Sequence, residues 1–144
     1  MIAVDSNILI YAHREESPFH AIADRCITGL AEGAAAWAIP WPCIHEFFSI
    51  VTHPHIFNPP TPQTVALDHI DFLLQSPTLV LLAETEQHWP QLRALLTSGQ
   101  VIGPRVHDAR IAALCLQHGV RELWSSDRDF GRFSDLNVVN PLVR

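Results

Sequence analysis

The chain opens with MIAVDSNILIYA (residues 1–12), the stretch that decides the fold. Its first four residues form a short apolar run of the kind that becomes a buried strand. Asp5, Ser6 and Asn7 follow, and these residue types end strands and cap the amino ends of helices. Apolar residues then continue in helical fashion from Ile8. The stretch therefore predicts a strand that leads directly into a helix, with an acidic side chain at the carboxyl end of the strand.

The same alternation continues through the rest of the chain. Further strands are predicted at 35–39, 78–82, 122–125 and 136–139, and helices from 17 to 33, from 42 to 52, from 61 onward, from 86 to 97 and from 106 to 118. Strands that alternate with helices favour a parallel sheet wrapped by helices, and in such folds sites lie at the carboxyl ends of strands. Asp5 and Asp127 both occupy such positions.

Prolines mark the boundaries of several of these elements. Ser17-Pro18 is typical of an N-cap followed by a first-turn proline, so a helix is expected to begin there. Residues 53–62 (HPHIFNPPTP) contain four prolines and predict an irregular loop. The helix after this loop is expected to bury one apolar side, formed by Val65, Ile70, Leu73 and Leu74.

Length and composition indicate a globular protein. With 144 residues, 48% of them apolar and 17% charged, the chain is expected to form a single domain over residues 1–144. The net charge of -6 gives no basic excess of the kind that accompanies broad nucleic-acid binding, although it leaves room for a local basic groove. Cys26, Cys43 and Cys115 lack metal-site spacing and are interpreted as reduced thiols. We expect a cytoplasmic protein without a signal peptide or membrane span.

Four acidic residues border or interrupt apolar segments: Asp5, Glu46, Asp108 and Asp127. Each has an ordinary structural interpretation, since Asp5 is able to cap a helix, Asp108 lies in a first helical turn and Asp127 is compatible with a solvated turn. Glu46, which lies among apolar residues of a helix, is the hardest to explain in that way. Carboxylates that converge beside a core repel one another unless a cation binds them, and oxygen ligands suit Mg²⁺ or Mn²⁺.

Taken together, the motifs match a known family. The four best-matching stretches are VDSNILIYA (4–12), PWPCIHEFFSIVTHP (40–54), VHDARIAAL (106–114) and SSDRDF (125–130). Through them the chain resembles the PIN-domain ribonucleases, specifically the VapC-like toxins of bacterial toxin–antitoxin pairs. This resemblance implies a PIN-like three-layer α/β/α fold with a central parallel sheet of four to five short strands.

The resemblance also implies a metal site. The acids of the family's site correspond to Asp5, Glu46, Asp108 and Asp127 in this sequence, and Asp129 falls where some members carry a further acid. Ser125 and Ser6 stand where the family usually has threonine, so both positions keep a hydroxyl group. On this basis Asp5, Asp108 and Asp127 are the expected ligands of Mg²⁺ or Mn²⁺, and Glu46 is expected to bind the metal or to orient a water molecule. Ser125 or Asn7 is expected to hold the carboxylates in place.

The implied activity is metal-dependent endoribonuclease cleavage, which hydrolyses RNA phosphodiester bonds. By the same resemblance the chain is expected to be a homodimer that a cognate antitoxin protein silences. One alternative is a PIN-type nuclease of RNA or DNA processing, whose larger relatives carry insertions for which this chain has no room. Another alternative is a non-catalytic PIN-like binding module, in which loss of one or more of the acids is expected.

Nine histidines make a zinc site worth considering, but the sequence argues against one. His45-Glu46 begins like the HExxH motif of zinc proteases, yet residue 49 is Ser where the second histidine is required. His53 and His55 are too close together, and too constrained by proline, to form a convincing chelate.

Two further groups of residues have both a functional and a structural interpretation. His53, His55 and Phe57 are compatible with stacking on unpaired bases, but a loop that packs on the dimer partner explains them as well.

The second group consists of arginines close in sequence to the acidic motifs. Their side chains are able either to contact phosphate or to pair with neighbouring acids. This group consists of Arg105, Arg110 and Arg128.

Overall fold

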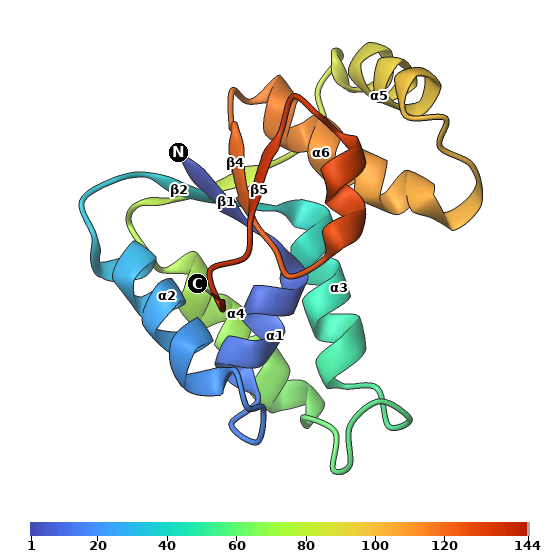
Figure 1. The fold of residues 1–144 in the computed structure, drawn as a ribbon. Coiled ribbons are helices and arrows are strands. Elements are labelled where there is room, and N and C mark those ends of the chain that lie inside the picture. The colour runs from blue at the N-terminus through green and yellow to red at the C-terminus, as the bar shows by residue number, and fades with distance from the viewer. Residues whose placement is uncertain (144) are drawn as a thin grey trace.

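A computed structural model describes residues 1–143 and shows one sheet of five parallel strands (Figure 1). In order across the sheet, the strands are β3 (Leu79–Leu82), β2 (Trp37–Pro40), β1 (Ile2–Val4), β4 (Glu122–Trp124) and β5 (Asn137–Val139). The first strand of the chain is therefore the central one, and Ala3 pairs with Ala38 on one side and with Leu123 on the other. The predicted α/β class with four to five short parallel strands is confirmed.

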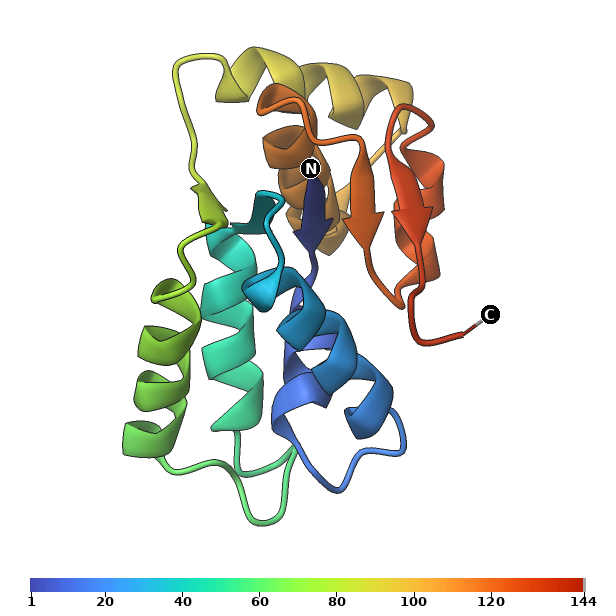
Figure 2. The ribbon, with the colours of Figure 1, turned by 90° about the vertical axis from the view of Figure 1, so that its left-hand side faces the viewer.

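The helices occupy three positions relative to the sheet. Figure 2 shows α1 to α4 gathered beyond the carboxyl ends of the strands, whereas α5 lies near their amino ends and α6 lies behind them. The longest helix has 13 residues, and across residues 1–143 no helix combines the length and the apolar character that a membrane crossing requires. The helices are α1 (Ser6–His13), α2 (His20–Glu32), α3 (Trp41–Val51), α4 (Gln63–Leu74), α5 (His88–Ser98) and α6 (Val106–Gln117), and the short 3₁₀ helices are η1 (Gly103–Arg105) and η2 (Arg128–Arg132).

The core lies between the sheet and the helices that cover it. Trp37, Phe47, Leu114 and Leu123 are fully buried in it. Helix α6 contributes Ala109 and the unbroken buried run 111–116, and Arg110 between them is half-buried. Full burial of a side chain such as Phe47, Leu114 or Leu123 stabilises the fold by about 1.5–3 kcal/mol. The core thus holds α6, and the acid in its first turn, at a fixed place beside the strands.

Two expectations about the helices are wrong in detail. Helix α2 begins at His20 and not at Ser17, because Ser17 uses its side chain to accept the Phe19 N–H within the preceding turn. In α4, Val65 is about half exposed and Leu74 is also exposed, whereas Ala66 and Leu73 are buried. Of the four residues expected on the buried side, Ile70 and Leu73 thus pack against the core, whereas Val65 and Leu74 do not.

Candidate active site

The ends of two neighbouring strands bring the first pair of candidate acids close together. Strands β1 and β4 pair in parallel, and the backbone N–H of Asp5 continues the ladder by donating to the carbonyl of Trp124 at 2.9 Å. Asp5 then begins α1, and Asp127 lies three residues after Trp124, at the start of η2. The parallel register thus places segments from opposite ends of the chain at one edge of the sheet.

Asp5 is a buried carboxylate surrounded by hydrogen-bond donors. It is only 3% exposed. The Ser6 N–H donates to its Oδ1 at 2.7 Å, and the Ser125 hydroxyl donates to its Oδ2 at 2.7 Å. Burial nevertheless raises the pKa of Asp5 to about 6, the nearby charge of Glu46 adds to this rise, and the hydrogen bonds only partly offset it. The surroundings therefore orient this group, while its burial makes its negative charge costly.

Ser125 and Asn7 tie the two strand ends together. The Ser125 hydroxyl, which donates to Asp5, also accepts from the Asn7 amide at 3.2 Å and from the Asp127 N–H at 3.0 Å. The Asn7 side chain donates to Asp5 Oδ2 at 3.2 Å and accepts from the Ser126 N–H at 3.1 Å. Because these groups are buried or half-buried, each bond restricts the positions of Asp5 and Asp127.

Three carboxylates form the tightest acidic group among residues 1–143. One oxygen from each of Asp108, Asp127 and Asp129 lies within 4.8 Å of the other two. Desolvation raises the pKa of Asp108, and the charges of Asp127 and Asp129 raise it further. Among residues 1–143, the one cation within 4.0 Å of these carboxylates is Arg105, whose Nη1 lies 3.9 Å from Asp129. The group therefore carries more negative charge than its protein surroundings balance.

Glu46 lies on the solvent side of α3. The helix buries Cys43, Ile44 and Phe47 but leaves Glu46 exposed, so its side chain is not held in the core as its apolar neighbours indicated. The Ser6 hydroxyl donates to Glu46 Oε1 and also lies 3.5 Å from Asp5 Oδ1. Glu46 thus reaches the buried acid through Ser6.

The predicted residues therefore fall into two connected parts. Asp108, Asp127 and Asp129 form the tight group, in which Asp129 takes a place that the sequence suggested only as an addition. Asp5 and Glu46 do not belong to that group, and they connect to it through the side chains of Ser6, Ser125 and Asn7. The donor set of the group consists of carboxylate oxygens that repel one another, which fits a hard divalent cation such as Mg²⁺ or Mn²⁺.

Two of the arginines near the acidic motifs form ion pairs. Arg105 approaches Asp129, and Arg110 donates through Nε to Glu84 Oε1 at 2.9 Å. Arg128 is exposed and, with Asp127, lines a cavity of about 300 Å³. Arg105 thus pairs with an acid of the acidic motifs, whereas Arg110 pairs with Glu84, which lies outside them.

The histidine-containing loop lies away from the strand ends. Both ribbon views place residues 53–62 at the far end of α3 (Figures 1 and 2). Within it, Phe57 lies beneath the guanidinium of Arg14 at 4.3 Å, and the rings of His53 and His55 lie 5.6 Å apart. These contacts are made within the chain, so both roles considered from the sequence, stacking on unpaired bases and packing on a dimer partner, stay predictions.

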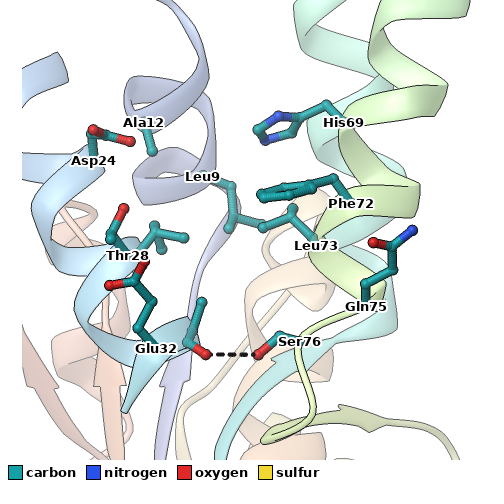
Figure 3. Close-up of a pocket in the computed structure, with 12 residues that line it drawn as sticks. Leu9, Ala12, Asp24, Thr28, Glu32, His69, Phe72, Leu73, Gln75 and Ser76 are labelled. Carbon is teal, nitrogen blue, oxygen red and sulfur yellow. Dashed lines mark hydrogen bonds between the residues drawn. The ribbon is translucent and has the colours of Figure 1, made fainter.

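Sequence reasoning missed a cleft of about 350 Å³ between α2 and α4. Figure 3 shows Leu9 of α1 in its floor, Asp24 and Glu32 on the α2 side, and His69 and Phe72 on the α4 side. Its lining is mainly apolar, and Phe72 is 71% exposed beside it. The signal for this cleft was present in α4, which carries more apolar residues than one buried face requires.

A parallel sheet with carboxylates gathered at its carboxyl edge defines an α/β domain with an acidic, metal-type site. Comparison with protein families matches residues 2–136 to the PIN domain, and the chain therefore belongs to the PIN-domain family. Ribonuclease VapC43 of Mycobacterium tuberculosis is 33% identical over 99% of this chain and 96% of its own length. Ribonuclease VapC48 of the same organism is 29% identical over 95% of this chain and 94% of its own.

The solved structures agree in fold. VapBC2 from Rickettsia felis, bound to a DNA fragment from its promoter, superimposes with a TM-score of 0.71 at 18% identity, over 96% of this chain and 98% of that chain. The similarity to the VapC type therefore extends over nearly the whole length of the chain, in sequence and in fold.

Proposed function

We propose that this chain is a VapC-type toxin, a metal-dependent endoribonuclease that hydrolyses RNA phosphodiester bonds. The observation that carries the proposal is the group of three carboxylates at the carboxyl edge of the sheet, with Asp5 and Glu46 connected to it. Relatives named as ribonucleases match almost the full chain, which supports the same activity here. The cofactor is Mg²⁺ or Mn²⁺.

The chain's own residues have distinct roles in this proposal. Asp108, Asp127 and Asp129 would hold the metal, together with Asp5, whose carboxylate Ser125 and Asn7 orient. A bound divalent ion supplies Lewis acidity to the phosphate and lowers the pKa of a bound water. Glu46 is exposed to solvent and held by Ser6, so it would be suited to orient the attacking water or to act as a general base.

The partner in this proposal is a cognate antitoxin, and we place one of its segments in the cleft between α2 and α4. An amphipathic segment would cover Phe72 and the apolar floor, and basic residues at its edge would pair with Asp24 and Glu32. Phe72→Asp should abolish copurification with the co-expressed antitoxin while leaving RNA cleavage by the free protein intact. Undiminished copurification would exclude this cleft.

The proposal includes a homodimer in the cytoplasm. Large apolar side chains that remain exposed on the monomer support association, among them Trp89 and Ile102, which are 60% and 82% exposed. The three cysteines are unpaired, which fits a reducing compartment. Light scattering of the purified protein should give about twice the mass of one chain.

The function is tested by incubating purified protein with total cellular RNA and Mn²⁺ or Mg²⁺. Discrete fragments are expected, and they should disappear with EDTA and in Asp5→Asn. Asp68→Asn, which changes an exposed acid on α4, is the matched control and should cleave like the wild type. Cleavage of single-stranded DNA instead of RNA would favour a processing nuclease, and the absence of any cleavage by folded protein would favour a binding module.

A further inference from the structure

A small cavity of about 120 Å³ lies between α3 and α6, beside the acidic site. Each helix lines it with three residues spaced by three and four positions, so each presents one face to it. Glu46 belongs to this lining and at the same time accepts the Ser6 hydroxyl. The cavity therefore shares a wall with the candidate active site. The lining residues are Pro42, His45, Glu46, His107, Arg110 and Ile111.

Arg110 gives this cavity a permanent positive charge. Its Nε is bonded to Glu84 at 2.9 Å, which leaves the four N–H groups of its two terminal nitrogens free of that contact. A guanidinium held in this way is able to bind a phosphate group with two parallel hydrogen bonds. Its pairing with Glu84 therefore positions the side chain without using up its donors.

His45 provides a flat ring at the same cavity. The ring is stacked on Trp41, with ring centroids 6.1 Å apart and planes 29° from parallel, and the residue is exposed. Unpaired bases stack on aromatic side chains of this kind, largely independently of base identity. The cavity thus combines a phosphate-binding cation with a stacking surface, which are the two groups that a single-stranded nucleotide needs.

We propose that this cavity binds one unpaired nucleotide of the RNA strand, adjacent to the phosphodiester at the acidic site, with its phosphate on Arg110 and its base on His45. This inference rests on the proposed function, because it assigns the substrate contact of the same site. It also gives a chain whose net charge is -6 a cation for the RNA backbone, since Arg110 lines the same cavity as Glu46.

The test measures binding of a fluorescein-labelled, single-stranded RNA of 20 random nucleotides by fluorescence anisotropy, with EDTA present so that it is not cleaved. Arg110→Gln should weaken binding about tenfold and should lower the slope of log K against log salt concentration by about 0.7, the value for one phosphate contact on a single strand. Arg110→Lys should keep that slope. Arg121→Gln, a change before β4 at the amino end of the strand, is the control and should alter neither quantity.

The stacking contact is tested by two substitutions of His45. His45→Ala should weaken binding about tenfold, while His45→Phe, which keeps a ring, should retain most of the affinity. Wild-type affinity and salt slope in Arg110→Gln, or no binding by the wild type, would overturn the inference. The proposed function is judged separately by cleavage with Mn²⁺. A protein that shows the Arg110 dependence but does not cleave would retain the nucleotide site and lose the nuclease assignment.

Discussion

At the scale of single residues, Ser125 is the side chain on which the geometry of the site depends most. Its hydroxyl contacts Asp5, Asn7 and the Asp127 N–H. Ser125→Ala should lower the free energy of unfolding by about 1–3 kcal/mol, because it leaves buried polar groups without a partner. It should also reduce RNA cleavage by roughly 10- to 100-fold, as for other groups that orient metal ligands. Urea unfolding and cleavage rates measure the two effects.

The neighbouring serine provides the control for this prediction. Ser126 contacts Asn7 through its backbone N–H, and that bond survives a change of side chain. Ser126→Ala should therefore leave both stability and cleavage close to wild type. Equal losses in the two variants would mean that the Ser125 hydroxyl has no special role.

A second residue prediction concerns pH. His69 packs against Phe47 and His13, with ring centroids 5.3 and 4.6 Å apart, and burial lowers the pKa of His69 from 6.5 to about 4. Because the folded-state pKa is depressed, the stabilisation is complete above pH 6.5 and is lost as the pH falls toward 4. The Tm should thus fall between pH 7 and pH 5, and His69→Phe should reduce that fall.

An exposed histidine separates this effect from general acid destabilisation. His55 lies in the loop after α3 and is exposed. His55→Gln should show the same fall in Tm between pH 7 and pH 5 as the wild type. If His69→Phe follows the wild type as well, His69 does not carry the pH dependence.

At the scale of elements, α6 is expected to contribute most to stability through its buried face. Leu114 is fully buried, and Leu114→Ala should cost about 2–5 kcal/mol of unfolding free energy, since it removes apolar contact and leaves a cavity. Leu67→Ala in α4 removes the same atoms from a side chain that is 46% exposed and should cost far less. Urea denaturation with unchanged m-values measures both, and similar losses would contradict the burial pattern.

The same elements show what could be predicted from the sequence. The strand that ends at Asp5 and the helix that contains Asp108 have local signals that agree with their packing, so both were predicted closely. Helix α4 was not, because its apolar residues Val65 and Phe72 face outward. The spacing of apolar residues along a helix predicts an apolar face, but it does not show whether the core or a partner protein covers that face.

The site was predicted in its residue types and only partly in its arrangement. Asp5, Asp108 and Asp127 were proposed from their positions at strand ends and a helix start, Glu46 from its place within an apolar helix, and all four from the family resemblance; their role as a metal site stays a prediction. The close approach of Asp129 to Asp108 depends on η2, where Asp127 accepts the Asp129 N–H at 2.9 Å and turns the chain back. A 3₁₀ helix of five residues such as η2 has too weak a sequence signal to predict where the Asp129 side chain lies.

At the scale of the whole molecule, binding of metal should stabilise the fold, because the folded chain assembles carboxylates that the unfolded chain keeps apart. With EDTA as reference, Mn²⁺ at about 100 times its Kd should raise Tm by roughly 5–10 °C. We expect one cooperative transition, since we propose that residues 1–144 form a single domain. Differential scanning fluorimetry measures both.

Removal of one acid tests where this metal binds. Asp127→Asn should lose most of the Mn²⁺-dependent rise in Tm, whereas Asp68→Asn, on the outside of α4, should keep it. An equal rise in both variants would place the ion elsewhere, and no rise in the wild type would argue against a preformed metal site.

The position of the first strand in the centre of the sheet has a consequence during synthesis of the protein on the ribosome. Asp5 emerges first, but its hydroxyl partner Ser125 is 120 residues later, and the neighbouring strand β4 is made only shortly before it. A growing chain is synthesised from its amino end, so a copy that has not yet reached β4 lacks Asp127 and Asp129, two of the three members of the acidic group. For the RNA-cutting enzyme proposed above, this order would keep the nascent chain harmless to the messenger and ribosome that produce it until Asp127 and Asp129 have been synthesised.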